Sequence, residues 1–593
     1  MTSFHPDFRS FLRALEKHGE LKRVSVEVDP ELEITEIASR MVREEGPALL
    51  FEKVKGSPFP LAINFFGNAR RIEIALGRTP REAGEELVRM AHALNPPRLR
   101  GLWKSRRTIR RLLAAHATKC RRGPCQEVVT EPALDRLPVL KCWPKDGGRF
   151  ITFGLVLTRH PVTGIRNVGL YRLQVFSPSL TGMHWQIERG GGFHYEEAEK
   201  RDQPLPAAIV IGTDPYLMMA SVAPLPEDMD EVAFSGFLRG RPMDMVKTAA
   251  LPGFDVPANA DFILEGEIPP QERQLEGPFG DHLGHYSLAA PFPVFHVRKM
   301  THRKNAVYPA AIVGKPPQED RYLGDALQEM FIPLIKLLRP EVADLWAYYE
   351  VGFHNLLVVS VNQRYVKESM KTALGILGEG QLSLTKCLVL VDHHVNVRDF
   401  HAVLHAIRQN MDVSEDVAIL PGVPLDTLDF TSYTMNLGSK LIIDATRRHG
   451  SALPKRPPAG DVFDLDLKRK YPEILGWRCW DGTLLVVQTA KEGRALLEKL
   501  VRDKSLEGVK IAAVVSPDVN IENRESMMWG LFNRFDCARD VIFSGTHLTG
   551  PVARYAGTMG IDATHKPGYP EPVEMSQGII ELVNRRWNEY GIR

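Results

Sequence analysis

The chain has 593 residues, of which 44% are hydrophobic and 25% are charged, so it can bury large cores and implies several domains. Its formal net charge of +2 gives no electrostatic reason to expect a nucleic acid or an anionic membrane as partner. No apolar run approaches the length that spans a bilayer. Scattered cysteines and the lack of a basic-then-apolar signal pattern predict a cytoplasmic protein.

The first part of the chain, residues 1–125, is predicted to be an α/β domain. Apolar residues at helical spacing follow Phe8, and Gly19 ends that helix. Short apolar runs alternate with amphipathic segments, as in a sheet covered by helices. Further helices are expected at residues 34–43 and 80–95, and strands at residues 49–51 and 60–65.

From about residue 128 short strands follow one another, separated by turns rich in Pro and Gly. This pattern predicts a β-barrel-like domain over residues 126–320. The strands are expected at residues 151–158, 167–176, 207–211, 262–268 and 292–299.

After residue 320, helices alternate with buried strands, which predicts an α/β domain with a parallel sheet over residues 321–455. Its pattern returns in residues 456–593. Residues 387–396 are echoed 124 residues later, and residues 443–446 are echoed 118 residues later, as in a diverged duplication. Thr558 stands where the first copy has Lys440, so the second copy is expected to be a scaffold or oligomer interface without an active site of its own.

Two carboxylates, Glu276 and Asp281, flank a turn that contains Gly277, Pro278 and Gly280. Such a turn can bring the two side chains together, and one member of a close pair can keep its proton near neutral pH. That arrangement suits protonation of a carbon or an oxygen atom. The alternative is an exposed turn with solvated acids.

Residues 166–175 read as a strand, on which Arg172 shares its face with Val168 and Leu170. A partly buried arginine would pair with a carboxylate and keep it ionised. The alternative is an edge arginine that reaches water. Alternation puts Asn167 on the opposite face from Arg172, so serving one site would need a bulge or a strand end between them.

These segments belong to an ordered set of motifs. The set comprises Asn167-Val-Gly-Leu-Tyr-Arg172, Arg189-Gly-Gly-Gly192, Ser221-Val-Ala-Pro-Leu-Pro226 with Glu231, Phe234-Ser-Gly-Phe-Leu-Arg239, Glu276-Gly-Pro-Phe-Gly-Asp281-His282, Gly314-Lys-Pro-Pro317 and Leu437-Gly-Ser-Lys440-Leu-Ile-Ile-Asp444-Ala-Thr446. In content and order it resembles the UbiD family of reversible decarboxylases, which use prenylated FMN. The resemblance implies that the middle domain is a split barrel that binds the flavin.

The resemblance assigns the catalytic network to Arg172, Glu276 and Asp281. It also implies a divalent metal, manganese or magnesium, that joins the flavin phosphate to the protein through Asn167 and Glu231. Glu188 occupies the place where many relatives carry a histidine. Carboxylate and amide oxygens suit these metals, so Glu188 is an acceptable third ligand. His184 and His194 are the alternatives.

Other residues are assigned by the same resemblance. Arg189, Ser221 and Pro224 match its flavin-contacting stretches, and Lys440 matches its phosphate partner. K+ is a further ion that the resemblance allows.

The implied reaction is the non-oxidative decarboxylation of an aromatic or α,β-unsaturated acid. The chain resembles the longer members that serve menaquinone biosynthesis, whose acid is a dihydroxynaphthoate. The alternative is 3-polyprenyl-4-hydroxybenzoate decarboxylation in ubiquinone biosynthesis. The expected partners are a small aromatic acid, a flavin prenyltransferase and further copies of the chain as dimer or hexamer, with peripheral membrane association as an option.

Two other classes of protein stay open. Asp281-His282-Leu-Gly-His285, together with His393-His394, could hold the metal of a hydrolase, although this spacing is a weak signal. A scaffold without catalysis would leave the combination of Arg172, Glu276 and Asp281 unexplained.

Overall fold

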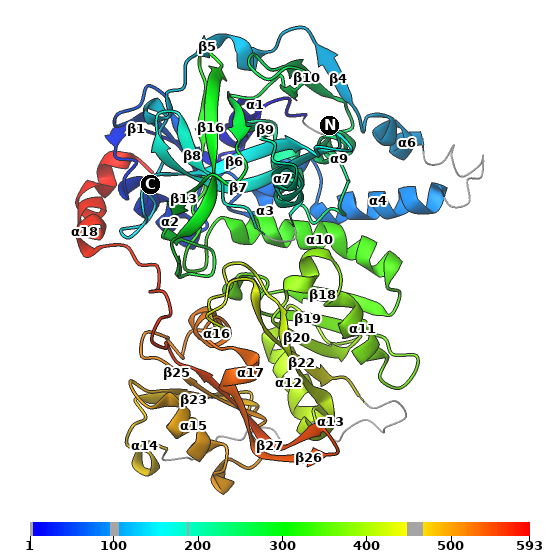
Figure 1. Cartoon of the computed structure of the whole chain (residues 1–593). Coiled ribbons are helices and arrows are strands. Elements are labelled where there is room, and N and C mark those ends of the chain that lie inside the picture. The colour runs from blue at the N-terminus through cyan, green and yellow to red at the C-terminus, as the bar shows by residue number, and fades with distance from the viewer. Residues whose placement is uncertain (1–3, 95–105, 187–188, 448–466, 593) are drawn as a thin grey trace. The chain divides into compact units, whose positions relative to one another are not determined.

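The computed structural model describes residues 4–94, 106–186, 189–447 and 467–592 (Figure 1). The chain forms two units. The first comprises Met1–Pro333 and Glu571–Arg593, and the second comprises Leu334–Pro570. No helix among the described residues is long and apolar enough to cross a membrane.

The first unit begins with a sheet in the order β1-β2-β3-β17, in which β1 runs parallel to β2. Its strands are β1 (Leu21–Val28), β2 (Ala48–Val54), β3 (Leu61–Ile63) and β17 (Tyr308–Pro309). Four helices accompany them, α1 (Phe8–Lys17), α2 (Glu33–Arg43), α3 (Ala69–Leu76) and α4 (Pro80–Leu94). The predicted α/β organisation is therefore present. Asp7 begins α1 by accepting a hydrogen bond from the Ser10 amide, which satisfies one free helix donor.

The middle of the chain forms a closed β-barrel, as predicted. Each strand pairs with the next in the ring β12-β9-β6-β7-β8-β16, and β12 pairs again with β16 to close it. The ring consists of β6 (Phe150–Arg159), β7 (Arg166–Ser177), β8 (Leu180–Gly182), β9 (Leu205–Ile211), β12 (Phe262–Ile268) and β16 (Ala290–His302). Tyr171 and Leu173 of β7 belong to the apolar core, as expected for alternate residues of one strand.

Shorter elements surround the barrel. β5 (Val128–Thr130) and β13 (Arg273–Glu276) pair with β16, and β14 (Phe279–Gly280) forms a hairpin with β15 (Tyr286–Ser287). A separate sheet contains β4 (Ala117–Cys120), β10 (Met243–Lys247) and β11 (Asp255–Pro257). The helices of this region are α6 (Arg106–Leu113), α7 (Gly190–Lys200), α8 (Pro215–Ala220) and α9 (Glu231–Arg239).

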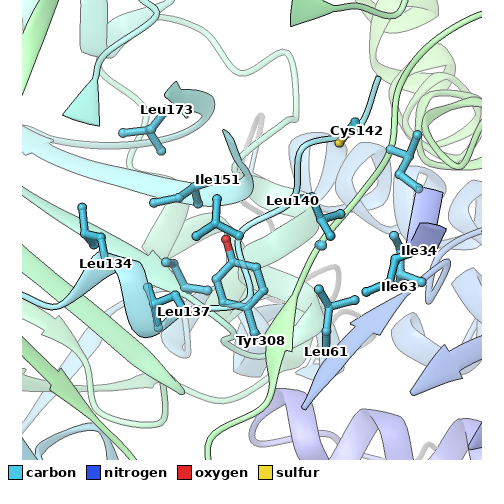
Figure 2. Packing of buried hydrophobic residues seen from close by; sticks show 14 of the residues in the cluster. Ile34, Leu61, Ile63, Leu134, Leu137, Leu140, Cys142, Ile151, Leu173 and Tyr308 are labelled. Carbon is cyan, nitrogen blue, oxygen red and sulfur yellow. The ribbon is translucent and has the colours of Figure 1, made fainter. Parts of the chain in front are cut away.

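One apolar core joins the N-terminal sheet to the barrel (Figure 2). Leu61 and Ile63 of β3 lie in the same cluster as Ile151 of β6, and Tyr308 is fully buried with them. Burial of each large apolar side chain contributes about 1.5–3 kcal/mol. The barrel that carries the site is therefore held against the N-terminal sheet.

The second unit contains two five-stranded sheets with the same strand order and directions. The first is β18 (Val342–Ala347), β19 (Leu357–Val361), β20 (Cys387–Asp392), β22 (Leu437–Ala445) and β21 (Val417–Pro424). The second is β23 (Gly476–Trp480), β24 (Leu484–Gln488), β25 (Ile511–Val515), β27 (Val552–Ala563) and β26 (Val541–Thr549). The edge strand on each side is antiparallel, so each sheet is mixed.

The helices follow the same duplication. In the first copy they are α11 (Glu368–Ile376), α12 (Phe400–Asn410) and α13 (Val413–Asp416), and in the second α15 (Gly493–Leu500), α16 (Arg524–Phe532) and α17 (Cys537–Asp540). The short α14 (Leu467–Lys470) precedes the second sheet, and α10 (Asp320–Leu338) contains the boundary between the two units. Asp416 accepts a hydrogen bond from the Asp412 amide at 2.9 Å, and Asp540 accepts one from the Asp536 amide at the same distance. Local hydrogen bonds thus repeat between the two copies.

The end of the chain departs from the predicted boundaries. The prediction placed residues 456–593 in the second repeat, whereas Glu571–Arg593 belongs to the first unit. There α18 (Gln577–Arg586) lies beside α2 (Figure 1). Arg586 and Tyr590 both bind the buried carboxylate of Glu33. These contacts join residues more than 500 positions apart, which no local pattern reveals.

Candidate active site

Three elements of the first unit bring the predicted catalytic residues together. Arg172 lies in the middle of β7, Glu276 is the last residue of β13, and Asp281 follows β14. β13 is fixed by its pairing with β16, where Glu276 lies opposite Ala290. The Gly/Pro turn between Glu276 and Asp281 therefore folds back, as the sequence predicted.

Arg172 lies between the two acids and binds both. Its Nε donates to Glu276 Oε1 at 3.0 Å, and its Nη1 donates to Asp281 Oδ2. Its Nη2 donates to Ser287 Oγ at 3.0 Å, and the guanidinium lies 4.8 Å from the Phe279 ring centre. The side chain is 8% exposed, so these charge-assisted bonds lie in a largely dehydrated environment. The expectation of a buried, carboxylate-paired arginine is met.

Both acids have lowered pKa values. Burial alone would raise the pKa of Asp281, but the charge of Arg172 and hydrogen bonds from His282 lower it well below its usual range. Burial would likewise raise the pKa of Glu276, but Arg172 and His184 outweigh it and the pKa is lowered. The positive charge of Arg172 between the two acids thus favours the ionised form of Glu276, whereas proximity of the acids alone would favour the protonated form.

Sequence reasoning missed the residues that hold the acidic loop. Asp146 accepts hydrogen bonds from the Gly280 and Trp143 amides, both at 2.8 Å. Gln174 accepts one from the Gly277 amide at 2.8 Å. These partners come from more than 100 residues upstream, so the only local signal for them is a polar residue in a predicted turn or strand.

His184 also contacts the catalytic acid. Its Nδ1 lies 2.6 Å from Glu276 Oε2, and both side chains are buried. Burial and the positive charge of Arg172 lower the pKa of His184, so its ring is neutral near pH 7. The sequence offered this histidine only as an alternative metal ligand.

Asn167 and Glu231 form a second polar group on β7 and α9. Asn167 Nδ2 donates to Glu231 Oε1 at 2.8 Å, and the amide of Val168 donates to Glu231 Oε2 at 2.8 Å. Burial raises the pKa of Glu231 to about 7, and Asn167 Oδ1 is buried with no partner among the described residues. A buried acid and an orphaned amide oxygen fit a hard divalent cation such as manganese or magnesium.

The two polar groups on β7 are separate. β7 has no bulge between Asn167 and Arg172, since the irregularity in its pairing with β6 lies on β6, between Ile151 and Gly154. Asn167 is the second residue of the strand. It pairs with α9, whereas Arg172 pairs with the loop after β13.

Glu188, the predicted third metal ligand, lies outside the described residues. His194, on α7, pairs its Nδ1 with Thr158 Oγ1 at 2.8 Å. Across the described ranges, no group of three or more His, Cys, Asp or Glu side chains is arranged to hold a metal. Among the residues that could have formed the metal site of a hydrolase, His282 bonds through its Nδ1 to the neighbouring Asp281.

The predicted flavin-contacting residues occupy different surroundings. Ser221 ends α8, and its carbonyl accepts a hydrogen bond from the Leu170 amide of β7 at 3.2 Å. Pro224 is exposed, and Arg189 precedes α7 as its N-cap. Lys440 belongs to the second unit, where its amine donates to the Ser383 and Thr385 carbonyls.

Three domain models of one protein family match successive parts of the chain. The N-terminal, Rift-related and C-terminal domains of 3-octaprenyl-4-hydroxybenzoate carboxy-lyase match residues 12–91, residues 117–316, and residues 321–445 with 474–563. The chain belongs to the UbiD family. Membership of this carboxy-lyase family leaves the hydrolase and scaffold alternatives without support.

UbiD relatives include proteins of similar length and shorter ones of known structure. The chain is 38% identical over 589 residues to a 4-hydroxybenzoate decarboxylase subunit from Chlamydia pneumoniae, and the match covers 98% of each chain. It is 27% identical to the vanillic acid decarboxylase of Sedimentibacter hydroxybenzoicus in its closed form, with a TM-score of 0.68 over 79% of this chain and 98% of that one. An evolved dimeric form of the UbiD-class enzyme HmfF from Pelotomaculum thermopropionicum, in complex with prFMN, is 28% identical, with a TM-score of 0.62 over 76% of this chain and 97% of that one.

Proposed function

We propose that this chain is a non-oxidative, reversible decarboxylase of aromatic or α,β-unsaturated carboxylic acids that works with prenylated FMN. The observation that carries the proposal is the buried ion group in which Arg172 binds both Glu276 and Asp281. Family membership and a relative of known structure that holds prFMN support the cofactor. When bound, prenylated FMN supplies an electron-accepting ring for the carbon that loses CO2.

Arg172 is suited to bind the substrate carboxylate. Among the described residues, its hydrogen bonds use one N–H of Nε, one of Nη1 and both of Nη2, which leaves one Nη1 hydrogen for a ligand. Asp281, ionised and buried, fixes the guanidinium in place. The arginine can therefore orient a carboxylate and then release CO2.

Glu276 supplies the proton. Arg172 and His184 lower its pKa, but an anionic substrate bound beside it would raise that pKa, because a further negative charge disfavours ionisation. Glu276 then takes up one proton, which it delivers to the carbon that has lost CO2. In the carboxylation direction the same carboxylate removes that proton.

The metal is proposed to be manganese or magnesium, with Asn167, Glu231 and Glu188 as its ligands. The donor set of Asn167 and Glu231 suits such an ion and would anchor the flavin phosphate. Arg189, Ser221 and Pro224 are proposed as flavin contacts. A flavin prenyltransferase is the proposed source of the cofactor.

The substrate is proposed to be an aromatic hydroxyacid. A dihydroxynaphthoate of menaquinone biosynthesis is the first candidate, because the chain has the length of the longer UbiD proteins. The name of the Chlamydia pneumoniae relative favours a 4-hydroxybenzoate as the second candidate.

The test is to co-express the chain with a flavin prenyltransferase, purify the coloured holoenzyme and measure CO2 release from both acids. We expect release from at least one of them. Absence of release from a panel of aromatic and unsaturated acids by flavin-loaded protein would contradict the proposal.

A further inference from the structure

His184 is held at the catalytic acid by both its donor atom and its ring. It lies two residues after β8, and its Nδ1 is 2.6 Å from Glu276 Oε2. The ring packs on Phe292 with 4.2 Å between ring centres and 34° between ring planes. At 4% exposure, the imidazole has no room to turn away into water.

The hydrogen bonds of Glu276 determine the tautomer of His184. Arg172 donates to Glu276 Oε1 at 3.0 Å, which stabilises the carboxylate form. A carboxylate can only accept hydrogen bonds, so the proton between Glu276 Oε2 and His184 belongs to Nδ1. The neutral ring then has an unprotonated Nε2.

This arrangement has a stability cost. His184 Nε2 is buried and has no hydrogen-bond partner among the described residues. Leaving such an atom unpaired costs about 1–3 kcal/mol. A phenylalanine would pack on Phe292 without that cost, so packing alone does not explain a histidine here.

We propose that His184 is a positioning residue for Glu276, acting as an obligatory Nδ1–H donor to Oε2. Arg172 holds Oε1 at 3.0 Å and reaches Oε2 only at 3.4 Å, so His184, at 2.6 Å, is the close donor to Oε2, and together the two residues fix the plane of the carboxyl group that exchanges the proton. Without His184, only the long contact from Arg172 holds Oε2, and Glu276 can rotate about its terminal bond while keeping the bond to Oε1. This inference rests on the proposed function of Glu276 as the acid.

Two substitutions of His184 test its hydrogen-bond donor and its aromatic ring separately. His184→Phe keeps the aromatic packing on Phe292 and removes the donor. His184→Asn places an amide N–H near the position of Nδ1 and restores it. In the holoenzyme we expect His184→Phe to lower kcat by about 10- to 100-fold with little change in KM, because small misplacements of a catalytic group have effects of that size. We expect His184→Asn to recover most of the loss.

His302→Phe is the matched control. His302 is also buried in the barrel and packs edge-on against Phe59. Its Nδ1 bonds to the neighbouring Arg303 carbonyl and not to Glu276, so its substitution should leave kcat unchanged. Metal content and flavin absorbance should match the wild type in all three variants; loss of metal in His184→Phe would overturn the positioning role.

The tautomer can be measured without cofactor or substrate. Nitrogen NMR of protein labelled with 15N-histidine, with His184→Phe used to assign the signal, should show Nδ1 protonated and Nε2 unprotonated near pH 7. Protonated Nε2 with bare Nδ1 would overturn the contact. If the wild-type holoenzyme releases no CO2 while the tautomer is as expected, the proposed function fails and the contact stands. If the wild type is active and His184→Phe has the same kcat, the positioning role fails.

Discussion

Arg172 keeps two buried carboxylates ionised, and its planar fork explains why an arginine is needed. Nε donates to Glu276, Nη1 donates to Asp281, and Nη2 donates to Ser287 and, at 3.4 Å, to Glu276. A lysine ammonium is a compact charge on a flexible stem and cannot reproduce that geometry. Charge alone therefore does not account for the site.

Arg172→Lys should lower kcat by about 100-fold or more while flavin absorbance stays unchanged, because one point charge cannot orient two acids and a substrate. Steady-state CO2 release by flavin-loaded protein is the measurement. The control is Arg298→Lys, since Arg298 lies on β16, is largely exposed and pairs only with Glu267 among the described residues. Full activity of Arg172→Lys would show that the planar geometry of the guanidinium is unimportant.

The proposed metal ligands give a second prediction at this scale. Glu188→Ala and Glu231→Ala should lose manganese and, with it, most of the bound flavin. His194→Ala should keep both, because its Nδ1 is already paired with Thr158. Elemental analysis beside flavin absorbance distinguishes the variants. A metal-free His194→Ala with a metal-loaded Glu188→Ala would make His194 the ligand.

At the scale of elements, the loop that joins β13 to β15 carries Glu276 and Asp281, and distant residues hold it. Asp146 accepts two backbone hydrogen bonds, one of them from Gly280 within this loop. β13 pairs with β16 before this loop, and Arg172 of β7 binds both of the acids. The positions of the two acids therefore depend on residues far away in the sequence.

Asp146→Asn should loosen this loop, because an amide cannot accept from both the Gly280 and Trp143 amides without turning its own NH2 toward one of them. The expected cost is about 1–3 kcal/mol, seen as faster hydrogen exchange of residues 277–287 and a lower kcat. Asp228→Asn, at an exposed position, is the control. Unchanged exchange in Asp146→Asn would remove Asp146 from the support of the site.

The strands and the duplication were predictable because they have local signatures. Apolar alternation predicted the barrel strands, and the echo of residues 387–396 at 511–520 predicted the second sheet. The register confirms the predicted match of Lys440 with Thr558. Lys440 donates to the Thr385 carbonyl, and Thr558 donates to the Val509 carbonyl at the same place in the second copy.

Long-range pairing was not predictable. β17 joins the first sheet from beyond the barrel, and His184 meets Glu276 across 92 residues. The lowered pKa of Glu276 also escaped prediction, because the sequence indicated that Arg172 pairs with a carboxylate but not that it lies between both acids. Pairing and charge both depend on positions that only the folded chain brings together.

At the scale of the whole molecule, each unit is held by contacts that join distant segments. In the second unit one core contains both Phe400 of the first repeat and Met528 of the second. α13 packs against β27, and α17 packs against β22, so each repeat places its short helix on the sheet of the other. Neither repeat is expected to be stable alone, because separation would expose this shared core.

In the first unit, the C-terminal segment, residues 571–593, makes contacts of this kind with the N-terminal part of the chain. Arg586→Ala combined with Tyr590→Phe should destabilise that unit by about 3–5 kcal/mol, because it removes the cation and the hydroxyl that bind Oε1 of the buried Glu33 carboxylate and leaves only the Asp29 amide at Oε2. Hydrogen exchange of α2 measures the effect, and the exposed Arg585→Ala is the control. Unchanged protection of α2 in the double variant would mean that α18 adds nothing to the stability of the first unit.

The most direct test of the account is Glu276→Gln in flavin-loaded protein. This change keeps the size of the side chain and removes the exchangeable acid. CO2 release should fall by at least about 1,000-fold, in the range expected for loss of a general acid, while flavin absorbance and metal content stay at wild-type values. CO2 release near the wild-type rate, from Glu276→Gln protein with normal flavin content, would contradict the central claim that Glu276 delivers the proton.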